Sequence, residues 1–206
     1  MVNARRRFVL HWFKCRELPV SPQKMPHEYG VRCAYYEGAI RHEGHIEHLR
    51  RKNPKHYPDL TFDWDNLFLA CGSRSHCGHY KDHNQAYNPD PLIKPDEHDP
   101  EDFLYFHSSG EVCVREGLNG ADKLRAETTI RVFGLKNPAL TSQRARAVRQ
   151  YQKLLAEDFE DLASWSEADR REYFENEIKE TRWQPYATTI KHFFKSALRP
   201  HPALRI

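Results

Sequence analysis

The chain has 206 residues, of which 39% are hydrophobic and 30% charged, and its formal net charge is +3. This balance excludes an intrinsically disordered chain and is typical of one globular domain, or of a small core with an appended helical region. No apolar run approaches the roughly 20 residues that span a bilayer, and no signal-peptide pattern follows the basic start, so we expect a cytoplasmic protein without a membrane partner.

The N-terminal half alternates predicted short elements with loops. Apolar and basic positions at helical spacing predict a first helix at 5–18. Two extended pieces are expected next, at 31–40 and 44–49, around a turn at Gly38 or Gly44. The segments expected after them are a basic loop at 50–62, the apolar run 67–71, a short helix within 76–83, a loop at 88–102 and a β-hairpin at 103–116.

From residue 121 onward the pattern is helical. Asn137 followed by Pro138 is typical of a helix start, and an apolar stripe continues through 139–163. Ser166 with Asp169 resembles a capping box that opens a helix at 167–181, and Pro185 precedes a last helix at 186–197. We expect two regions, 1–118 and 119–206, with the second packed on the first or on a partner.

Histidine and cysteine are concentrated in one stretch. More than half of the 13 histidines fall between residues 42 and 83, together with Cys33, Cys71 and Cys77 of the five cysteines. An odd cysteine count without an export signal argues against a disulfide framework. Histidine and cysteine are the usual ligands of zinc, although three buried cysteines can also be small apolar core residues. Cys15 and Cys113 are expected to have no functional role.

Adjacent Glu47 and His48 offer the chemistry that hydrolyses a phosphodiester. Histidine is a suitable general base near neutral pH, and a carboxylate is a suitable ligand for a hard divalent cation. Neighbouring side chains of a strand point to opposite faces, so one site can hold both only if the backbone bends. A solvated surface pair is the alternative reading.

The surrounding residues resemble a known family. Cys33-Ala34-Tyr35-Tyr36-Glu37 precedes His45-Ile46-Glu47-His48, and Trp64-Asp65-Asn66-Leu67, Cys71, Cys77 and Lys81 follow. This order resembles HNH nucleases of antiviral defence systems, which read approximately as a CAYCE box, an IEH or IDH box before a basic stretch, a W-x-NL box and a C-x-x-C-N-x-x-K close. The resemblance covers residues 30–82 and is greatest to PtuB-like nuclease subunits of Septu systems, including versions encoded beside retrons.

The resemblance implies a fold and a set of roles. The fold class is mainly α with a small ββα-metal core and a peripheral β-hairpin. His48 would be the general base, oriented by Asn66, and Glu47 would be a ligand of the catalytic Mg²⁺ or Mn²⁺. Lys52 and Lys81 would contact phosphate. Asn66 could instead be a turn residue or a helix cap.

Two positions depart from the family pattern. Tyr36 replaces the second cysteine of the first box, and Gly78 replaces the asparagine after the last cysteine. The implied zinc clip therefore needs another ligand, and we predict Cys33, Cys71, His76 and Cys77, although adjacent ligands at 76 and 77 are strained. His79 is the candidate for the second ligand of the catalytic metal.

Two other features have a plain structural interpretation. Arg144, Arg146 and Arg149 are most simply the exposed face of a helix, with contact to a phosphate backbone as the alternative. Phe193 and Phe194 belong to the core or to a subunit contact.

We therefore expect a metal-dependent HNH endonuclease that acts on nucleic acid, preferably DNA, as the toxic effector of an antiphage complex. The resemblance implies a PtuA-like partner, an ATPase of the ABC or SMC type, and in some systems a retron reverse transcriptase with its small DNA. The alternatives are the same enzyme with an RNA or tRNA target, and a degenerate HNH scaffold that binds nucleic acid or a partner without cutting.

Overall fold

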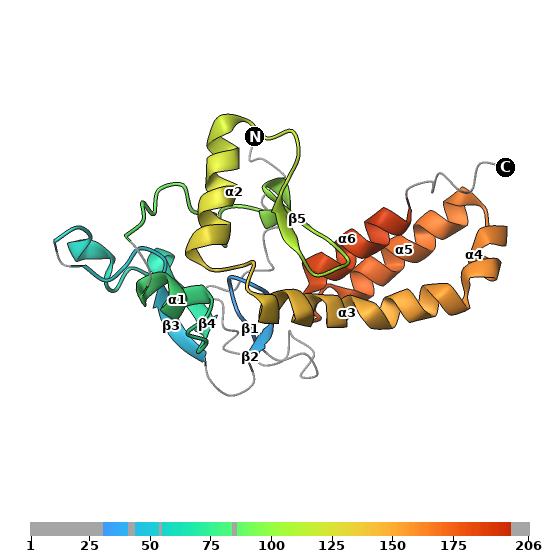
Figure 1. Cartoon of the computed structure of the whole chain (residues 1–206), viewed down its shortest axis with the longest axis horizontal. Helices are drawn as coiled ribbons and strands as arrows, with labels where there is room; N and C mark the ends of the chain where they lie inside the picture. The colour runs from blue at the N-terminus through green and yellow to red at the C-terminus, as the bar shows by residue number, and fades with distance from the viewer. Residues whose placement is uncertain (1–30, 41–43, 54, 84–85, 199–206) are drawn as a thin grey trace, which may run out of the picture.

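The computed structural model describes residues 31–40, 44–53, 55–83 and 86–198 (Figure 1). The predicted helix at 5–18, the basic residues 5–7 and Cys15 lie outside these ranges. None of the helices in the described ranges combines the length and the apolar character that a bilayer crossing requires.

The first elements form two short antiparallel hairpins followed by a helix. β1 (Val31–Arg32) pairs with β2 (Ala39–Ile40), and β3 (Gly44–His48) pairs with β4 (Leu67–Cys71). The 31–40 segment is thus a hairpin, because Cys33 and Gly38 bond across a tight turn. The helix α1 (Cys77–His83) packs against β4, and Ala34 donates to the carbonyl of Leu69.

A third hairpin lies at the predicted position. β5 (Leu104–Phe106) pairs with β6 (Val112–Val114) around the Ser-Ser-Gly turn. Gly110 has a φ of +88°, and a Cβ on it would lie 1.9 Å from the carbonyl oxygen of Thr141. Only glycine fits there, because the backbone is left-handed and in contact with the next helix.

The C-terminal half is helical and its caps agree with the sequence. The side chain of Asn137 accepts from the N–H of Ala139, and Ser166 accepts from the N–H of Asp169. The elements are α2 (Gly120–Val132), α3 (Pro138–Glu157), α4 (Phe159–Ser164), α5 (Glu167–Thr181) and α6 (Ala187–Ala197).

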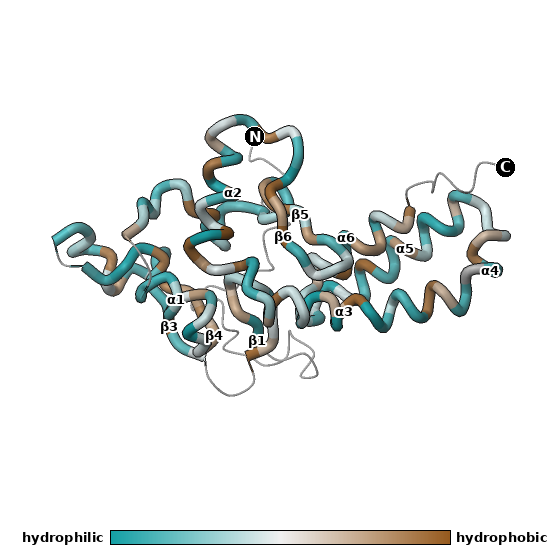
Figure 2. Tube along the Cα trace, in the orientation of Figure 1, coloured by the Kyte–Doolittle hydropathy of each residue, from teal (hydrophilic) through white to brown (hydrophobic). Residues whose placement is uncertain are grey.

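Buried apolar residues form two clusters. The first joins the hairpins to α2 and runs from Cys33 to Leu135, and the second lies among α3, α5 and α6. Because α2 packs in the first cluster, the predicted division at 118/119 falls inside one core. Figure 2 shows α3 and α5 as largely hydrophilic with apolar residues at intervals, as expected for helices that bury one stripe. Leu154 on the predicted stripe is 49% exposed, whereas Phe194 is buried.

Polar side chains fix the C-terminal helices to the first hairpin. The Glu37 carboxylate accepts from the backbone N–H and the hydroxyl of Thr188, at 3.0 and 2.6 Å, and so caps α6. Arg32 donates to the carbonyl of Gln184 at 3.0 Å. Arg144 is 1% exposed and donates to the carbonyl of Leu135 at 2.9 Å, so the expectation that it lies on an exposed face is wrong.

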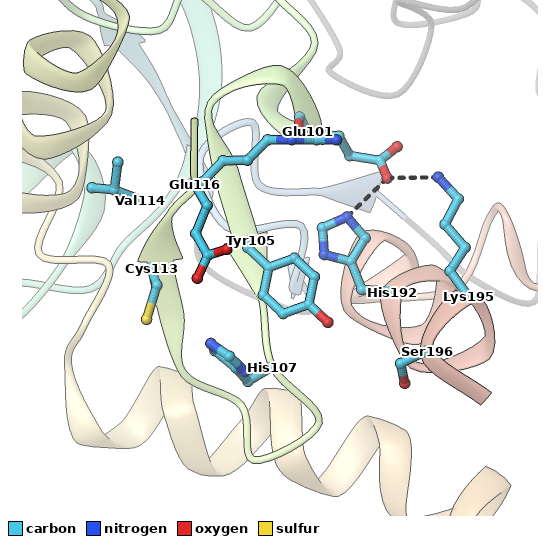
Figure 3. A pocket seen from close by; sticks show the side chains of 10 residues that line it. Glu101, Tyr105, His107, Cys113, Val114, Glu116, His192, Lys195 and Ser196 are labelled. Carbon is cyan, nitrogen blue, oxygen red and sulfur yellow. Dashed lines mark hydrogen bonds and ion pairs between the residues drawn. The ribbon is translucent and has the colours of Figure 1, made fainter. Parts of the chain in front are cut away.

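A pocket of about 600 Å³ opens between the β5–β6 hairpin and α6 (Figure 3). At its edge Glu101 accepts from His192 at 2.9 Å and forms ion pairs with Lys191 and Lys195. Burial opposes the charge of Glu101, but these cationic neighbours outweigh it and lower the pKa of the carboxyl to about 2. The group therefore links the hairpin to α6.

Candidate functional site

The two adjacent residues Glu47 and His48 have different surroundings. β3 stays in register with β4 as far as the pair His48 and Leu67, so the two side chains leave opposite faces of the strand. Glu47 points into the protein and is 3% exposed, whereas His48 is half-buried on the other side. The bend that would bring both onto one face of the strand does not occur within β3.

Glu47 lies in a closed polar nest. Its Oε1 is 2.7 Å from Nζ of Lys81, and its Oε2 is 3.0 Å from Nε2 of His45. His45 was not among the predicted site residues, although its position two residues before Glu47 places it on the same strand face. Nδ1 of His45 is buried and has no hydrogen-bond partner within the described part of the chain.

Lys81 is 1% exposed, and its ammonium lies among three oxygen acceptors. Besides Glu47 it contacts the carbonyl of His48 at 2.8 Å and a carboxylate oxygen of Asp82 at 2.7 Å. Burial opposes its charge, but the Glu47 carboxylate together with Tyr87 and Asp82 outweighs that effect, and the pKa of Lys81 is raised. The sequence suggested that Lys81 contacts a phosphate, but the buried position of its ammonium does not allow that contact.

Gly78 makes room for the Glu47 carboxylate. A Cβ on Gly78 would lie 2.2 Å from Oε2 of Glu47. An asparagine at this position, as in the family pattern, would require Glu47 to move. The departure at Gly78 and the inward orientation of Glu47 are thus one structural feature.

His79 does not complete a ligand set with Glu47. Its ring stacks on that of His45, with centroids 4.1 Å apart and planes at 10°. Among the described residues, only one group of three or more His, Cys, Asp or Glu has its ligand atoms within 4.8 Å of one another, and that group contains neither Glu47 nor His79.

His48 is held by the segment that connects β3 to β4. Its Nε2 lies 2.9 Å from the carbonyl oxygen of Thr61. Because a carbonyl only accepts, Nε2 carries the proton when the ring is neutral, and Nδ1 then has the free lone pair of a base.

Asn66 acts on this connecting segment and not on the imidazole. Its Nδ2 donates to the carbonyls of Arg50 and Leu60, at 2.9 and 3.0 Å, and its Oδ1 accepts from the N–H of Arg50 at 2.7 Å. The predicted direct bond from Asn66 to His48 is therefore not formed. Asn66 instead binds Leu60, the residue before Thr61. The carbonyl of Thr61 in turn orients the His48 ring.

The thiols of Cys33, Cys71 and Cys77 form the one group of described residues whose ligand atoms all lie within 4.8 Å of one another. Sγ of Cys33 and Sγ of Cys77 are 3.8 Å apart. Zinc–sulfur bonds of about 2.3 Å in a tetrahedron require sulfur atoms about 3.8 Å apart, so the spacing fits a zinc ion.

His76 lies beside this group. Its Nδ1 is 3.7 Å from Sγ of Cys71 and 3.2 Å from Sγ of Cys77. The strain expected from adjacent ligands is visible, because Cys77 has a φ of +62° in the left-handed region. Tyr36 packs edge-on against the His76 ring with centroids 5.1 Å apart. Tyr36, which stands where the family pattern has a cysteine, thus packs against His76, the residue that can serve as the fourth ligand in place of that cysteine.

The thiols differ in acidity. Burial raises the pKa of Cys33 to about 12 and also raises the pKa of Cys77. Hydrogen bonds from these two thiols lower the pKa of Cys71. One thiolate is therefore favoured at Cys71 without metal, and a bound cation would displace the other two protons.

Lys52 is exposed in the basic segment that follows β3. This placement is compatible with the predicted phosphate contact, which stays a prediction.

Comparison with curated proteins found a relative for this chain. The chain is 28% identical over 147 residues to the Septu protein PtuB of Bacillus mycoides (strain KBAB4). The chain is similar to a PtuB protein. The match covers 59% of this chain and 48% of the relative, so the chain spans about half the length of the protein that it matches. No family model matches the sequence. This similarity agrees with the resemblance based on residues 30–82, and it supports a PtuB-like protein.

Proposed function

We propose that this chain is a metal-dependent HNH endonuclease and the effector subunit of a Septu-type antiphage complex. The observation that carries the proposal is the imidazole of His48, which the Thr61 carbonyl fixes with Nδ1 available as a base. The β3–β4–α1 order, in which two antiparallel strands precede a helix, supports an assignment of this unit as the ββα core. The similarity to PtuB supports the biological setting.

His48 would take a proton from the attacking water through Nδ1. Thr61 and Asn66 would keep the ring oriented, because they hold the backbone and the proton on Nε2. A catalytic Mg²⁺ or Mn²⁺ would supply charge neutralisation at the phosphate. The donors at Glu47 do not fit such a cation as they are arranged, since Lys81 and His45 occupy the two carboxylate oxygens.

Zinc is proposed at the second centre, where the donors fit. Cys33, Cys71, Cys77 and His76 would hold the ion and so join the β1–β2 turn to the start of α1. This centre would have a structural role, because its ligands fill a tetrahedral site and leave no open position for substrate.

DNA is the preferred substrate of the proposed enzyme, with an RNA or tRNA target as the alternative. We propose a PtuA-like ATPase as the partner, because the relative belongs to a Septu system. A retron reverse transcriptase with its small DNA is a further proposed partner, which rests on the sequence resemblance.

A degenerate scaffold that binds without cutting has specific support of its own. The buried ion pair between Lys81 and Glu47 neutralises the carboxylate that would bind the catalytic cation. Gly78 supplies no ligand in the place of the family asparagine. Calorimetric titration of the zinc-loaded protein with Mn²⁺ discriminates the two functions: the enzyme binds the ion at a second site, and the scaffold does not.

The direct test compares His48→Ala with His56→Ala in the protein co-expressed with its ATPase partner. His56 is an exposed histidine of the same β3–β4 connection, so its loss is the matched control. We expect His48→Ala to remain folded and bound to the partner, and to lose nucleic-acid cleavage and toxicity. Unchanged cleavage by His48→Ala would overturn the assignment of the base.

A further inference from the structure

Two aromatic side chains stand in solvent on the segment that holds His48. Phe62 is 88% exposed and Trp64 is 52% exposed. They are two residues apart, and Phe62 directly follows Thr61, whose carbonyl binds the His48 ring. Single exposed apolar residues are ordinary, but two large exposed aromatic rings beside a candidate catalytic base indicate a binding surface.

The backbone that carries these rings is fixed. Asn66 bonds the carbonyl of Leu60 on one side of them, and its own N–H donates to the carbonyl of Asp63 on the other. The Asp63 side chain also caps the short 3-10 helix Trp64–Asn66 by accepting from the N–H of Asp65. The two rings are thus presented by a braced turn and lose little backbone freedom when they bind a partner.

The charge of this segment identifies the kind of partner. Between β3 and β4 lie four cationic side chains, of Arg50, Arg51, Lys52 and Lys55, and three acidic ones, of Asp59, Asp63 and Asp65. Arg50 and Arg51 are already paired, with Asp90 and Asp82. The cationic excess is therefore small, and a duplex backbone bound by charge alone would find few partners here.

Unpaired nucleobases match what the segment offers. Aromatic side chains bind unpaired bases by stacking, in any sequence, and a few lysines suffice to follow the backbone. Bases inside a duplex have no free face to stack on. Lys52 and Lys55 are exposed in the same connection and can contact the phosphates of such a strand.

We propose that Phe62 and Trp64 form a stacking platform for unpaired bases next to the scissile phosphate, so that the substrate is single-stranded at the cut. This inference rests on the proposed nuclease function. It names the structural class of the substrate, and it covers single-stranded DNA and single-stranded RNA alike.

The test measures binding by the full-length protein without divalent cation, so that binding is read apart from cleavage. Fluorescently labelled single-stranded DNA, single-stranded RNA and a DNA duplex of equal length are titrated with wild type, Phe62→Leu and Phe62→Tyr. Leucine keeps the apolar bulk and removes the ring, whereas tyrosine keeps the ring. Phe62 is so exposed that neither change is expected to affect folding.

We expect wild type and Phe62→Tyr to prefer one or both single strands over the duplex. Phe62→Leu should weaken single-strand binding about 10-fold and leave duplex binding unchanged. Trp64→Ala should have an effect of similar size, and Trp165→Ala, at an exposed tryptophan of the α4–α5 corner, should have none. Because few charges take part, single-strand affinity should fall only slightly with salt.

Three results would overturn the platform. The first is equal affinity of wild type for the duplex and for the single strands. The second is equal single-strand binding by Phe62→Leu and Phe62→Tyr. The third is a Phe62→Leu protein that binds oligonucleotides as wild type does but no longer binds the proposed ATPase partner, which would make this a protein-docking surface. A failure of the nuclease proposal is recognised separately, because it would appear as the absence of any metal-dependent cleavage by wild type, whatever the binding measurements show.

Discussion

The two candidate metal centres lie close together in the fold and are prepared to different degrees. At the thiol centre, Cys33, Cys71 and Cys77 converge at zinc-like spacing, and the His76 ring lies beside Cys71 and Cys77. At the Glu47 centre the carboxylate is buried against Lys81 and His45. The difference shows that ligand types in the right order are not sufficient for a site. Thiols meet without charge repulsion because most are neutral, whereas a buried carboxylate needs a cation, and here a lysine supplies it.

The largest effect is expected from removing a thiol ligand. Cys71→Ser should abolish zinc binding and lower stability by at least about 4 kcal/mol, because metal binding contributes directly to folding. Elemental analysis and thermal unfolding measure both effects. Cys113→Ser is the control, since Cys113 lies outside the thiol group. Retention of zinc by Cys71→Ser would contradict the assigned centre.

Next in size is the loss of the lysine at the other centre. Lys81→Met leaves the Glu47 charge buried without its partner and should cost about 3–5 kcal/mol in the absence of added cation. Added Mn²⁺ should restore part of that stability if Glu47 can bind it. Lys52→Met, at an exposed lysine, should change neither quantity. Chemical denaturation with and without Mn²⁺ gives the answer, and a variant as stable as wild type would show that the ion pair is unimportant.

The partly buried carboxylate of Glu101 contacts His192, Lys191 and Lys195, which belong to neither candidate metal centre. Its pKa is lowered to about 2 in the folded protein from an ordinary value of 4.5. The stabilisation is therefore complete above about pH 4.5 and is lost as the pH falls towards 2, with a size of about 3 kcal/mol. Glu101→Gln should remove this acid dependence in denaturation curves and leave metal content unchanged. An identical pH profile for the variant would contradict the role of the His192 and lysine contacts.

The smallest effect on stability is expected at Gly78. Gly78→Asn restores the family residue but places a Cβ against the Glu47 carboxylate. We expect a loss of about 1–2 kcal/mol, since Glu47 must move. The same variant should bind Mn²⁺ more tightly, which calorimetry would detect. Gly120→Asn is the matched control, because Gly120 is also near the start of a helix and no atom lies within 4 Å of its Cβ.

Much of the fold follows from local sequence signals. The caps at Asn137 and Ser166, the Ser-Ser-Gly hairpin and the helix at 167–181 all lie where the sequence predicts them, because each depends on a few neighbouring residues. The buried position of Arg144 was not predictable, since it depends on the carbonyls of Leu135 and Gly110 in other elements.

The candidate site also combines features that local sequence predicts with features that depend on packing. Cys33, Cys71 and Cys77 lie together and α1 lies within the predicted range 76–83, because the spacing of the boxes brings these residues to one place; zinc there stays a prediction. The pairing of Glu47 with Lys81 was not, since the lysine comes from a helix 34 positions along the chain and only packing shows which way it points. His45 was not predicted, although the alternation of side chains along β3 places it on the same face as Glu47.

The proposed role of His48 can be tested by measuring cleavage and zinc content together. Cleavage of labelled nucleic acid and zinc content are determined on the same preparations of wild type and His48→Ala, each in complex with the proposed ATPase partner and at increasing Mn²⁺ concentration. We predict metal-dependent cleavage by wild type, none by His48→Ala, and equal zinc in both. Cleavage by His48→Ala at the wild-type rate, or cleavage by wild type that does not respond to Mn²⁺, would contradict this prediction.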